Sequence, residues 1–213
     1  MMLIEVFTPR GALTGERRLE AGERLLTEVT AHDGTPPEIL EAARSLWHVV
    51  FVEPDAWMNG VGALSPDEPP RFFVRVTLPS DGTSITHEVR ADYVARITRA
   101  LALTGDDRER FQREPHVAVH IVEIPEGSFG TLGRAMRTAD IVKLATAAAG
   151  TPRPATPVEP GADTATDPVC GMTVALDDTA ILLTRDGRTY AFCGDPCRQV
   201  FAEQLAARSG PAH

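Results

Sequence analysis

The stretch LIEVFTPRGAL, residues 3–13, is the most informative about the fold, because a similar stretch, FFVRVTLP, occurs at residues 72–79. Both stretches begin with apolar strand-like residues and reach a proline at the same point. A constant offset of 70 residues aligns identical pairs without a gap: Val6 with Val76, Pro9 with Pro79, Val49 with Val119, Glu53 with Glu123, and Gly60 with Gly130. The first two thirds of the chain are therefore predicted to be an internal repeat.

Each half of the repeat has the pattern of a strand, a helix and a second strand. The predicted strands are LIEVF, WHVVFVE, FFVRVTL and HVAVHIVEI, residues 3–7, 47–53, 72–78 and 116–124. Apolar residues at helical spacing lie between the strands of each half: Leu19, Leu26 and Val29 in the first, and Val89, Tyr93, Ile97 and Leu101 in the second. Two tandem βαβ units follow from this order.

The predicted fold class is α+β, with the two repeats forming one four-stranded sheet that carries its helices on one face. Right-handed crossovers make the strands within each unit parallel. Thr14 and Thr86 stand where helix N-caps are expected. The glycine-containing segments WMNGVG (57–62) and GSFGTLGRAM (127–136) are predicted hairpins, and TADIVKLATA (138–147) is a predicted closing helix.

Composition places the chain among globular proteins. Its 43% hydrophobic and 24% charged residues are ordinary for a globular domain. The net charge of -9 argues against nucleic-acid binding. We expect no membrane insertion and no secretory signal, hence a cytoplasmic protein with reduced thiols. The excess of arginine over lysine and the abundant alanine indicate a GC-rich, bacterial genome.

Residues 149–166 are predicted to be a linker, because this Pro/Ala/Thr-rich segment contains four prolines and almost no large apolar residue. It separates a first domain, residues 1–148, from a small second domain, residues 167–210. The first domain would hold repeats over about 2–65 and 71–137, followed by the closing helix. The alternative, a surface loop within one domain, is disfavoured because long loops without structure are uncommon in compact domains.

The first domain resembles the tautomerase superfamily, which includes the oxalocrotonate tautomerases and macrophage migration inhibitory factor. The resemblance covers residues 2–148 and is carried by LIEVFTPRGAL, by HIVEIPEGSFGTLGRA (120–135) and by the repeat itself. It implies a homotrimer or a hexamer of βαβ units. It also implies catalysis by an N-terminal proline, whose amine acts as a general base, beside arginines that hold a substrate carboxylate.

This chain departs from that catalytic pattern. Met2 stands at the position of the proline, while Ala12 and His48 stand where arginines are usual. Pro70 opens the second repeat but has no free amine because it is internal. We therefore expect no catalytic residues and a non-enzymatic, degenerate scaffold.

An enzyme with residual tautomerase-type or dehalogenase-type activity, regulated by the C-terminal domain, is the alternative. Its base would be the α-amine of Met1, aided by Arg10 or Arg71. His48 and His120 lie on apolar strands, where a lone histidine is more often a core residue than a ligand or base. Trp47 and Trp57 are likewise interpreted as packing residues.

The three cysteines lie in the last quarter of the chain, and their number and clustering favour a metal site or redox chemistry over a disulfide framework. Cys170 lies in a predicted tight turn between Pro168 and Gly171. AILLTR (180–185) and TYAF (189–192) predict a hairpin turning at Asp186-Gly187. Cys193 ends this hairpin, and Cys197 lies in the first turn of a helix. A helix N-terminus favours thiolates, so these cysteines are candidate metal ligands.

The C-terminal segment resembles the YHS domain, a relative of the TRASH metal-binding fingers. The residues that match are DPVCGM (167–172), Tyr190, Phe192, Cys193, Cys197 and Phe201, with the spacing C-x22-C-x3-C. Gly194 departs from the usual serine after the second cysteine. The resemblance implies heavy-metal binding by Cys170, Cys193 and Cys197. Its members occur beside metal-transporting ATPases, mercury-resistance proteins and some monooxygenases, so a metal transporter or metalloenzyme is the expected partner.

Three thiolates suit Zn(II), Cu(I) or Hg(II), with Zn(II) and Cu(I) as the leading metal ions. The fourth position would be open to water or to a ligand other than cysteine. Met172 is either a thioether ligand for Cu(I) or a packing residue. The leading function is metal sensing, buffering or delivery on a trimeric tautomerase-like scaffold. The alternative without metal binding is a small C-terminal domain with three free cysteines, which acts as a structural adaptor.

Overall fold

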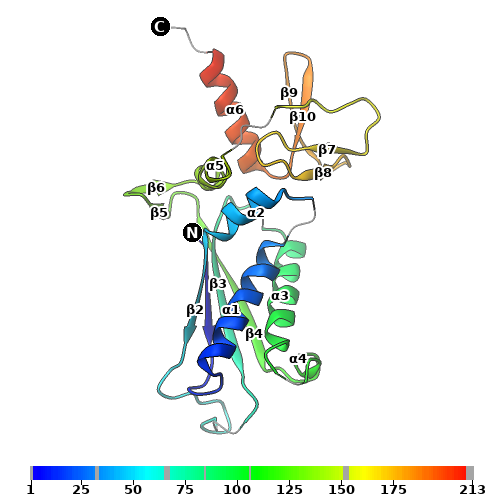
Figure 1. The fold of residues 1–213 in the computed structure, drawn as a ribbon. Coiled ribbons are helices and arrows are strands. Elements are labelled where there is room, and N and C mark those ends of the chain that lie inside the picture. The colour runs from blue at the N-terminus through cyan, green and yellow to red at the C-terminus, as the bar shows by residue number, and fades with distance from the viewer. Residues whose placement is uncertain are drawn as a thin grey trace. The chain divides into compact units, whose positions relative to one another are not determined.

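The computed structural model describes residues 2–31, 34–64, 68–83, 85–105, 107–150 and 154–209 (Figure 1). Met1, whose amine the alternative enzyme would use, lies outside these residues, as does Gly210 at the end of the predicted second domain. The chain forms two compact units. The first, here the sheet unit, comprises Met1–Ala31, Trp47–Leu78 and Ile85–Ile124. The second, the cysteine unit, comprises His32–Leu46, Pro79–Ser84 and Pro125–His213.

The sheet unit contains the predicted four-stranded sheet in the order β2-β1-β3-β4. The strands are β1 (Met2–Phe7), β2 (Trp47–Val52), β3 (Phe72–Ser80) and β4 (Val117–Pro125). β1 pairs in parallel with β2, with Ile4 opposite Val49. β1 pairs antiparallel with β3, with Ile4 opposite Val76. The first strands of the two repeats thus lie side by side at the centre of the sheet, which confirms the fold predicted from the repeat.

Two long helices cover one face of this sheet, α1 (Gly15–Thr30) and α3 (His87–Ala102) (Figure 1). Thr14 and Thr86 cap them as predicted, because their hydroxyls accept hydrogen bonds from the backbone N–H groups of Arg17 and Val89. A short helix, α4 (Arg110–Arg113), follows α3. The core beneath the helices contains these buried residues: Ile4, Val6, Leu25, Val29, Trp47, Phe72, Val74, Val76, Ile97 and Leu101.

The opposite face of the sheet is more open. Strand side chains alternate between the two faces, and on this face Phe7 and Phe73 are half-buried while Val50 and Val122 are exposed. His48 and His120 are also exposed, so their interpretation as core histidines was wrong. Apolar neighbours along a strand cannot show which face of the sheet the helices cover.

Both predicted hairpins after the second strands are present. Met58 forms a bridge with Ala63 in the first segment. In the second, β5 (Phe129–Thr131) pairs with β6 (Arg134–Met136). The predicted closing helix is α5 (Thr138–Ala148).

The cysteine unit contains the predicted hairpin and helix: β9 (Ile181–Arg185), β10 (Arg188–Phe192) and α6 (Asp195–Ser209). Asp186 and Gly187 turn the hairpin with φ angles of 51° and 72°, the left-handed values that suit a two-residue turn. β7 (Thr164–Thr166) and β8 (Thr173–Ala175) form a second, shorter antiparallel pair that the sequence analysis did not predict.

The core of the cysteine unit also includes residues from distant parts of the chain. Ile39, from α2 (Pro37–Arg44), and Ala139, from α5, are buried in the same cluster as Phe192, Val200 and Phe201. Elements on both sides of the proline-rich segment therefore share one core. The boundaries of the two predicted domains and their linker stay a prediction. No helix among the described residues is long and apolar enough to cross a membrane.

Candidate metal centre

The three cysteines predicted as metal ligands converge, together with a carboxylate, at one place in the cysteine unit. One potential ligand atom from each of Asp167, Cys170, Cys193 and Cys197 lies within 4.8 Å of every other. The Sγ atoms of Cys170 and Cys193 are 3.6 Å apart, as are those of Cys193 and Cys197. All three thiols are free. Such a cluster could hold a metal ion.

Cys170 is presented by a tight backbone loop that closes on itself. The Gly171 N–H donates to the carbonyl oxygen of Asp167 at 2.8 Å, and the Asp167 N–H donates to the carbonyl oxygen of Met172 at 2.9 Å. Gly171 has a φ of 76°, in the left-handed region that favours glycine. The geometry of the turn thus favours a glycine directly after Cys170.

Cys193 and Cys197 are placed by the junction between β10 and α6. Phe192, the last residue of β10, is 1% exposed and packs against Phe201 of α6, with ring centroids 5.5 Å apart. Tyr190 contacts the same ring at 4.8 Å. These aromatic contacts hold the helix against the hairpin, so that Cys197 in its first turn faces Cys193. The N-terminus of α6 adds a positive partial charge beside the sulfurs.

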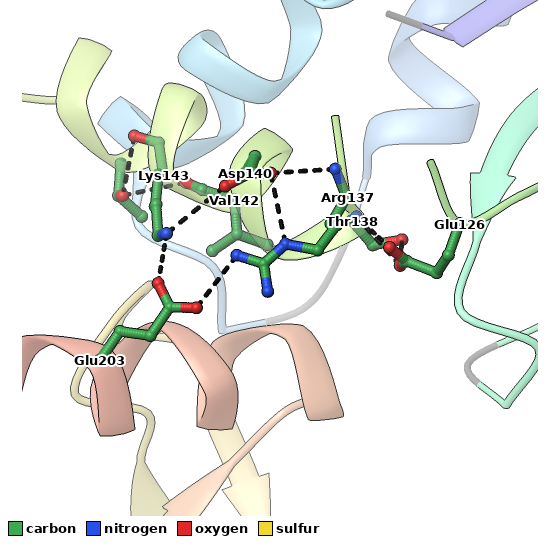
Figure 2. Close-up of polar contacts among 8 residues, drawn as sticks. Glu126, Arg137, Thr138, Asp140, Val142, Lys143 and Glu203 are labelled. Atoms are coloured by element: carbon green, nitrogen blue, oxygen red, sulfur yellow. Dashed lines mark hydrogen bonds and ion pairs between the residues drawn. The ribbon is translucent and has the colours of Figure 1, made fainter. Parts of the chain in front are cut away.

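Ion pairs attach α6 to α5 (Figure 2). Glu203 accepts a hydrogen bond from the guanidinium of Arg137 at 3.0 Å and another from the ammonium of Lys143. Asp140 lies on the other side of Lys143, at 3.4 Å. Glu126 accepts from the backbone N–H of Thr138 and so holds the start of α5. The orientation of α6, and with it the position of Cys197, therefore depends partly on contacts with residues that precede the cysteine-containing segment 167–209.

The cysteines differ in their access to solvent. Cys170 and Cys197 are buried, whereas Cys193 is exposed. Met172 is half-buried and packs against the hydrophobic cluster, which supports the packing interpretation of its thioether. An ion held by the three sulfurs would be reachable from the side of Cys193.

The three thiols share their protons. Hydrogen bonds from Cys193 and Cys197 lower the pKa of Cys170, because they stabilise its thiolate. The pKa values of Cys193 and Cys197 are raised, first by their hydrogen bonds with Cys170. These shifts favour a thiolate at Cys170 beside protonated thiols at Cys193 and Cys197, and a thiolate attracts a cation. A bound cation would displace the remaining protons.

Asp167 is the residue of this cluster that sequence analysis did not identify as part of the site. It is fully buried, and burial raises the pKa of its carboxyl, with a further contribution from the charge of Cys170. The signal for it was the Asp-Pro pair ahead of the turn, since aspartate side chains commonly accept backbone N–H groups two or three residues ahead. Asp167 also accepts a hydrogen bond from the N–H of Cys193, 26 residues further along the chain, and no local sequence pattern predicts that contact.

Comparison with known proteins finds no matching family model and no matching curated protein. Solved structures with a similar fold are tautomerase-superfamily proteins. Pt0534 inactivated by 2-oxo-3-pentynoate is 17% identical, with a TM-score of 0.48, over 65% of this chain and 98% of its own. N1, of the cis-3-chloroacrylic acid dehalogenase family, is 21% identical, with a TM-score of 0.46, over 63% and 82%. A fused 4-OT symmetric trimer is 18% identical, with a TM-score of 0.46, over 63% and 94%. At these values the similarity bears on neither activity nor assembly of this chain.

Proposed function

We propose that this protein binds a soft or borderline heavy-metal ion through the thiolates of Cys170, Cys193 and Cys197. The observation that carries the proposal is the spacing of the sulfurs, 3.6 Å for two of the three pairs. In a tetrahedral site with metal–sulfur bonds of about 2.3 Å, neighbouring sulfurs lie about 3.8 Å apart. The thiols thus already have nearly the separation that one bound ion requires.

The donor set and its exposure suggest which metal ions are bound and how they exchange. Three thiolates suit Zn(II) or Cu(I), and Hg(II) belongs to the same class of ions. The exposed Cys193 supports sensing, buffering or delivery over permanent structural binding, because a thiol of a partner can approach the ion from that side. A metal transporter or metalloenzyme with a thiolate site of its own is the matching kind of partner.

The sheet unit would serve as an oligomeric scaffold, which is the role that the tautomerase resemblance implies. Its open face carries the half-buried rings of Phe7 and Phe73, 6.0 Å apart, with Val50 and Val122 exposed beside them. Glu5 and Arg75 form an ion pair beside these rings, so the face is mixed. Its apolar side chains support self-association through that face. Met2 occupies the position of the catalytic proline in the resemblance, which supports a scaffold over an enzyme.

Elemental analysis of protein purified under reducing conditions, then reconstituted with Zn(II) or Cu(I), tests the metal site. We expect about one ion per chain, lost in a Cys193→Ser, Cys197→Ser double variant. An Asp177→Asn variant is the matched control, because Asp177 is an exposed turn residue of the same unit. A wild-type protein that retains no ion after reconstitution would overturn the proposal and favour the structural adaptor.

One observation favours the alternative, an enzyme with tautomerase-type activity. The Nε atom of Arg71, next to the start of β3, is buried and has no hydrogen-bond partner in the described structure, while another nitrogen of the same guanidinium donates to Glu68 at 3.3 Å. His116 lies near it, and its pKa is lowered by burial and then by the charge of Arg71. An enol–keto conversion lost in Arg71→Ala but retained in the cysteine double variant would support this enzyme.

A further inference from the structure

The carboxylate of Asp167 joins the two backbone segments that carry Cys170 and Cys193. Its Oδ1 accepts hydrogen bonds from the N–H groups of Val169 at 2.7 Å and Cys170 at 3.2 Å. Its Oδ2 accepts from the N–H of Cys193 at 2.9 Å. Two of these three donors are therefore the backbone groups of cysteines whose sulfurs converge.

We propose that Asp167 is the positioning residue of the metal site and not its fourth ligand. Its carboxylate holds the turn at Cys170 against the end of β10, so that the thiolates alone bind the ion. The fourth coordination position then faces solvent on the side of Cys193, the exposed cysteine. This inference rests on the proposed metal binding by the three thiolates and assigns the role of the residue beside them.

Hydrogen bonding favours the positioning role over ligation. A carboxylate that turned toward the ion would weaken its bonds to the N–H groups of Cys170 and Cys193. The N–H of Cys170 is buried, and a buried N–H without a partner is costly, which opposes that movement. The carboxylate already has three donors to offset its charge where it lies.

Exposure is consistent with the same role. Cys193 is the exposed cysteine of the cluster, so a ligand from solvent can reach the ion on its side. The site would therefore accept water or an imidazole at the fourth position.

Co(II) is a suitable probe for the full-length protein, because its thiolate charge-transfer bands report sulfur ligation and its d–d bands report the fourth ligand. On titration with imidazole, we expect the d–d bands of the wild type to shift while the charge-transfer intensity is retained. Unchanged d–d bands, or a loss of charge-transfer intensity, would overturn the inference. Absence of any charge-transfer band would instead refute metal binding by the thiolates, so the two failures are distinguishable.

The variant Asp167→Asn tests the residue itself. The amide retains an acceptor for Val169 and Cys170 but presents a donor to the Cys193 N–H. We expect the Co(II) affinity, measured by chelator competition, to fall about 10–100-fold, the usual effect of changing a residue that supports the ligands. At saturating Co(II) the spectrum should match the wild type, and Asp167→Ala should lose more affinity than Asp167→Asn.

Asp177→Asn is the control, because the carboxylate of Asp177 also accepts a backbone N–H in a turn, from Thr179 at 2.8 Å, but is exposed. It should leave the affinity unchanged. A saturated Asp167→Asn spectrum with altered d–d bands would show that the carboxylate is a ligand. Should this variant fail to fold, the imidazole titration of the wild type remains decisive.

Discussion

Gly34 packs directly against Thr173, the first residue of β8 after the Cys170 turn. A Cβ atom at residue 34 would lie 2.9 Å from the hydroxyl oxygen of Thr173 and 3.0 Å from its Cβ. Gly34 also has a φ of 72°, which L-residues with side chains rarely adopt. The segment that leads into α2 therefore approaches the strand next to the metal site as closely as a glycine allows.

Gly34→Ala should destabilise the cysteine unit in two ways, through backbone strain and through overlap with Thr173. Left-handed backbone alone costs about 1–2 kcal/mol, and overpacking typically adds about 1–3 kcal/mol. We expect the midpoint of urea unfolding to fall accordingly. Gly161→Ala is the matched control, because Gly161 has a φ of 77° but nothing within 4 Å of its Cβ position. Equal losses in both variants would show that the contact with Thr173 contributes nothing.

Metal loading should stabilise α2 and α5 as well as residues 167–209, which carry the cysteines. Ile39 and Ala139 are buried in the same cluster as Cys170 and Cys197, so an ion bound to these thiolates stabilises the whole core. With free Zn(II) at 100 times Kd, ligand binding contributes about 2.7 kcal/mol, which slows amide exchange through unfolding by roughly 100-fold. Hydrogen exchange of α2 and α5 with and without Zn(II) measures this effect.

The amides of α1 provide the internal control for that experiment, because α1 belongs to the sheet unit. Protection restricted to residues 167–209 would contradict the shared core. Zn(II) added to the cysteine double variant should protect neither helix.

Acidification should weaken the attachment of α6 to α5. Hydrogen bonds from Lys143 and then Arg137 lower the pKa of Glu203, so the folded state holds the carboxylate ionised more strongly than the unfolded state does. The resulting stability is complete above the unfolded pKa of about 4.3 and is lost as the pH falls through the lower folded pKa. Because Glu203 is 42% exposed, its contribution is roughly 0.5 kcal/mol.

Urea unfolding of Glu203→Gln across the acid range measures this contribution. The difference from the wild type should be present at neutral pH and should vanish at the lowest pH. Glu159→Gln is the comparison, since Glu159 is an exposed residue of the same unit for which the described structure shows no ion pair. A pH-independent difference would contradict the ionic origin of the effect.

A charge on the open face of the sheet should dissociate the proposed trimer. Phe73 packs against His120, with ring centroids 4.4 Å apart, and against Phe7 on the same face. Phe73→Glu would place a carboxylate there, which is unfavourable in an apolar interface. We expect light scattering to report a trimer for the wild type and a lower mass for the variant.

Leu19→Glu is the control for that measurement, because Leu19 is 76% exposed on α1, on the helical side of the sheet. Its mass should equal that of the wild type. A monomeric wild type, or an unchanged mass for Phe73→Glu, would rule out assembly through this face.

Local features of the fold and of the site could be predicted from the sequence because short-range interactions determine them. The alternation in LIEVF, the caps Thr14 and Thr86, and the Asp186-Gly187 turn each depend on residues a few positions apart. The repeat then indicated the sheet, since two similar βαβ units pair in few ways. The convergence of Cys170, Cys193 and Cys197 followed from a turn, a hairpin and a helix start.

The three-dimensional structure was needed to show which distant segments share a core and which face of the sheet stays open. The sequence does not show which unit Ile39 packs in, because the apolar residues of its helix do not identify the elements that they contact. His48 and His120 are exposed because the helices cover the other face of their strands. Asp167 reaches the N–H of Cys193 only because packing brings the turn to the end of β10. Such contacts depend on packing between residues far apart in the chain. Local sequence patterns therefore do not predict them.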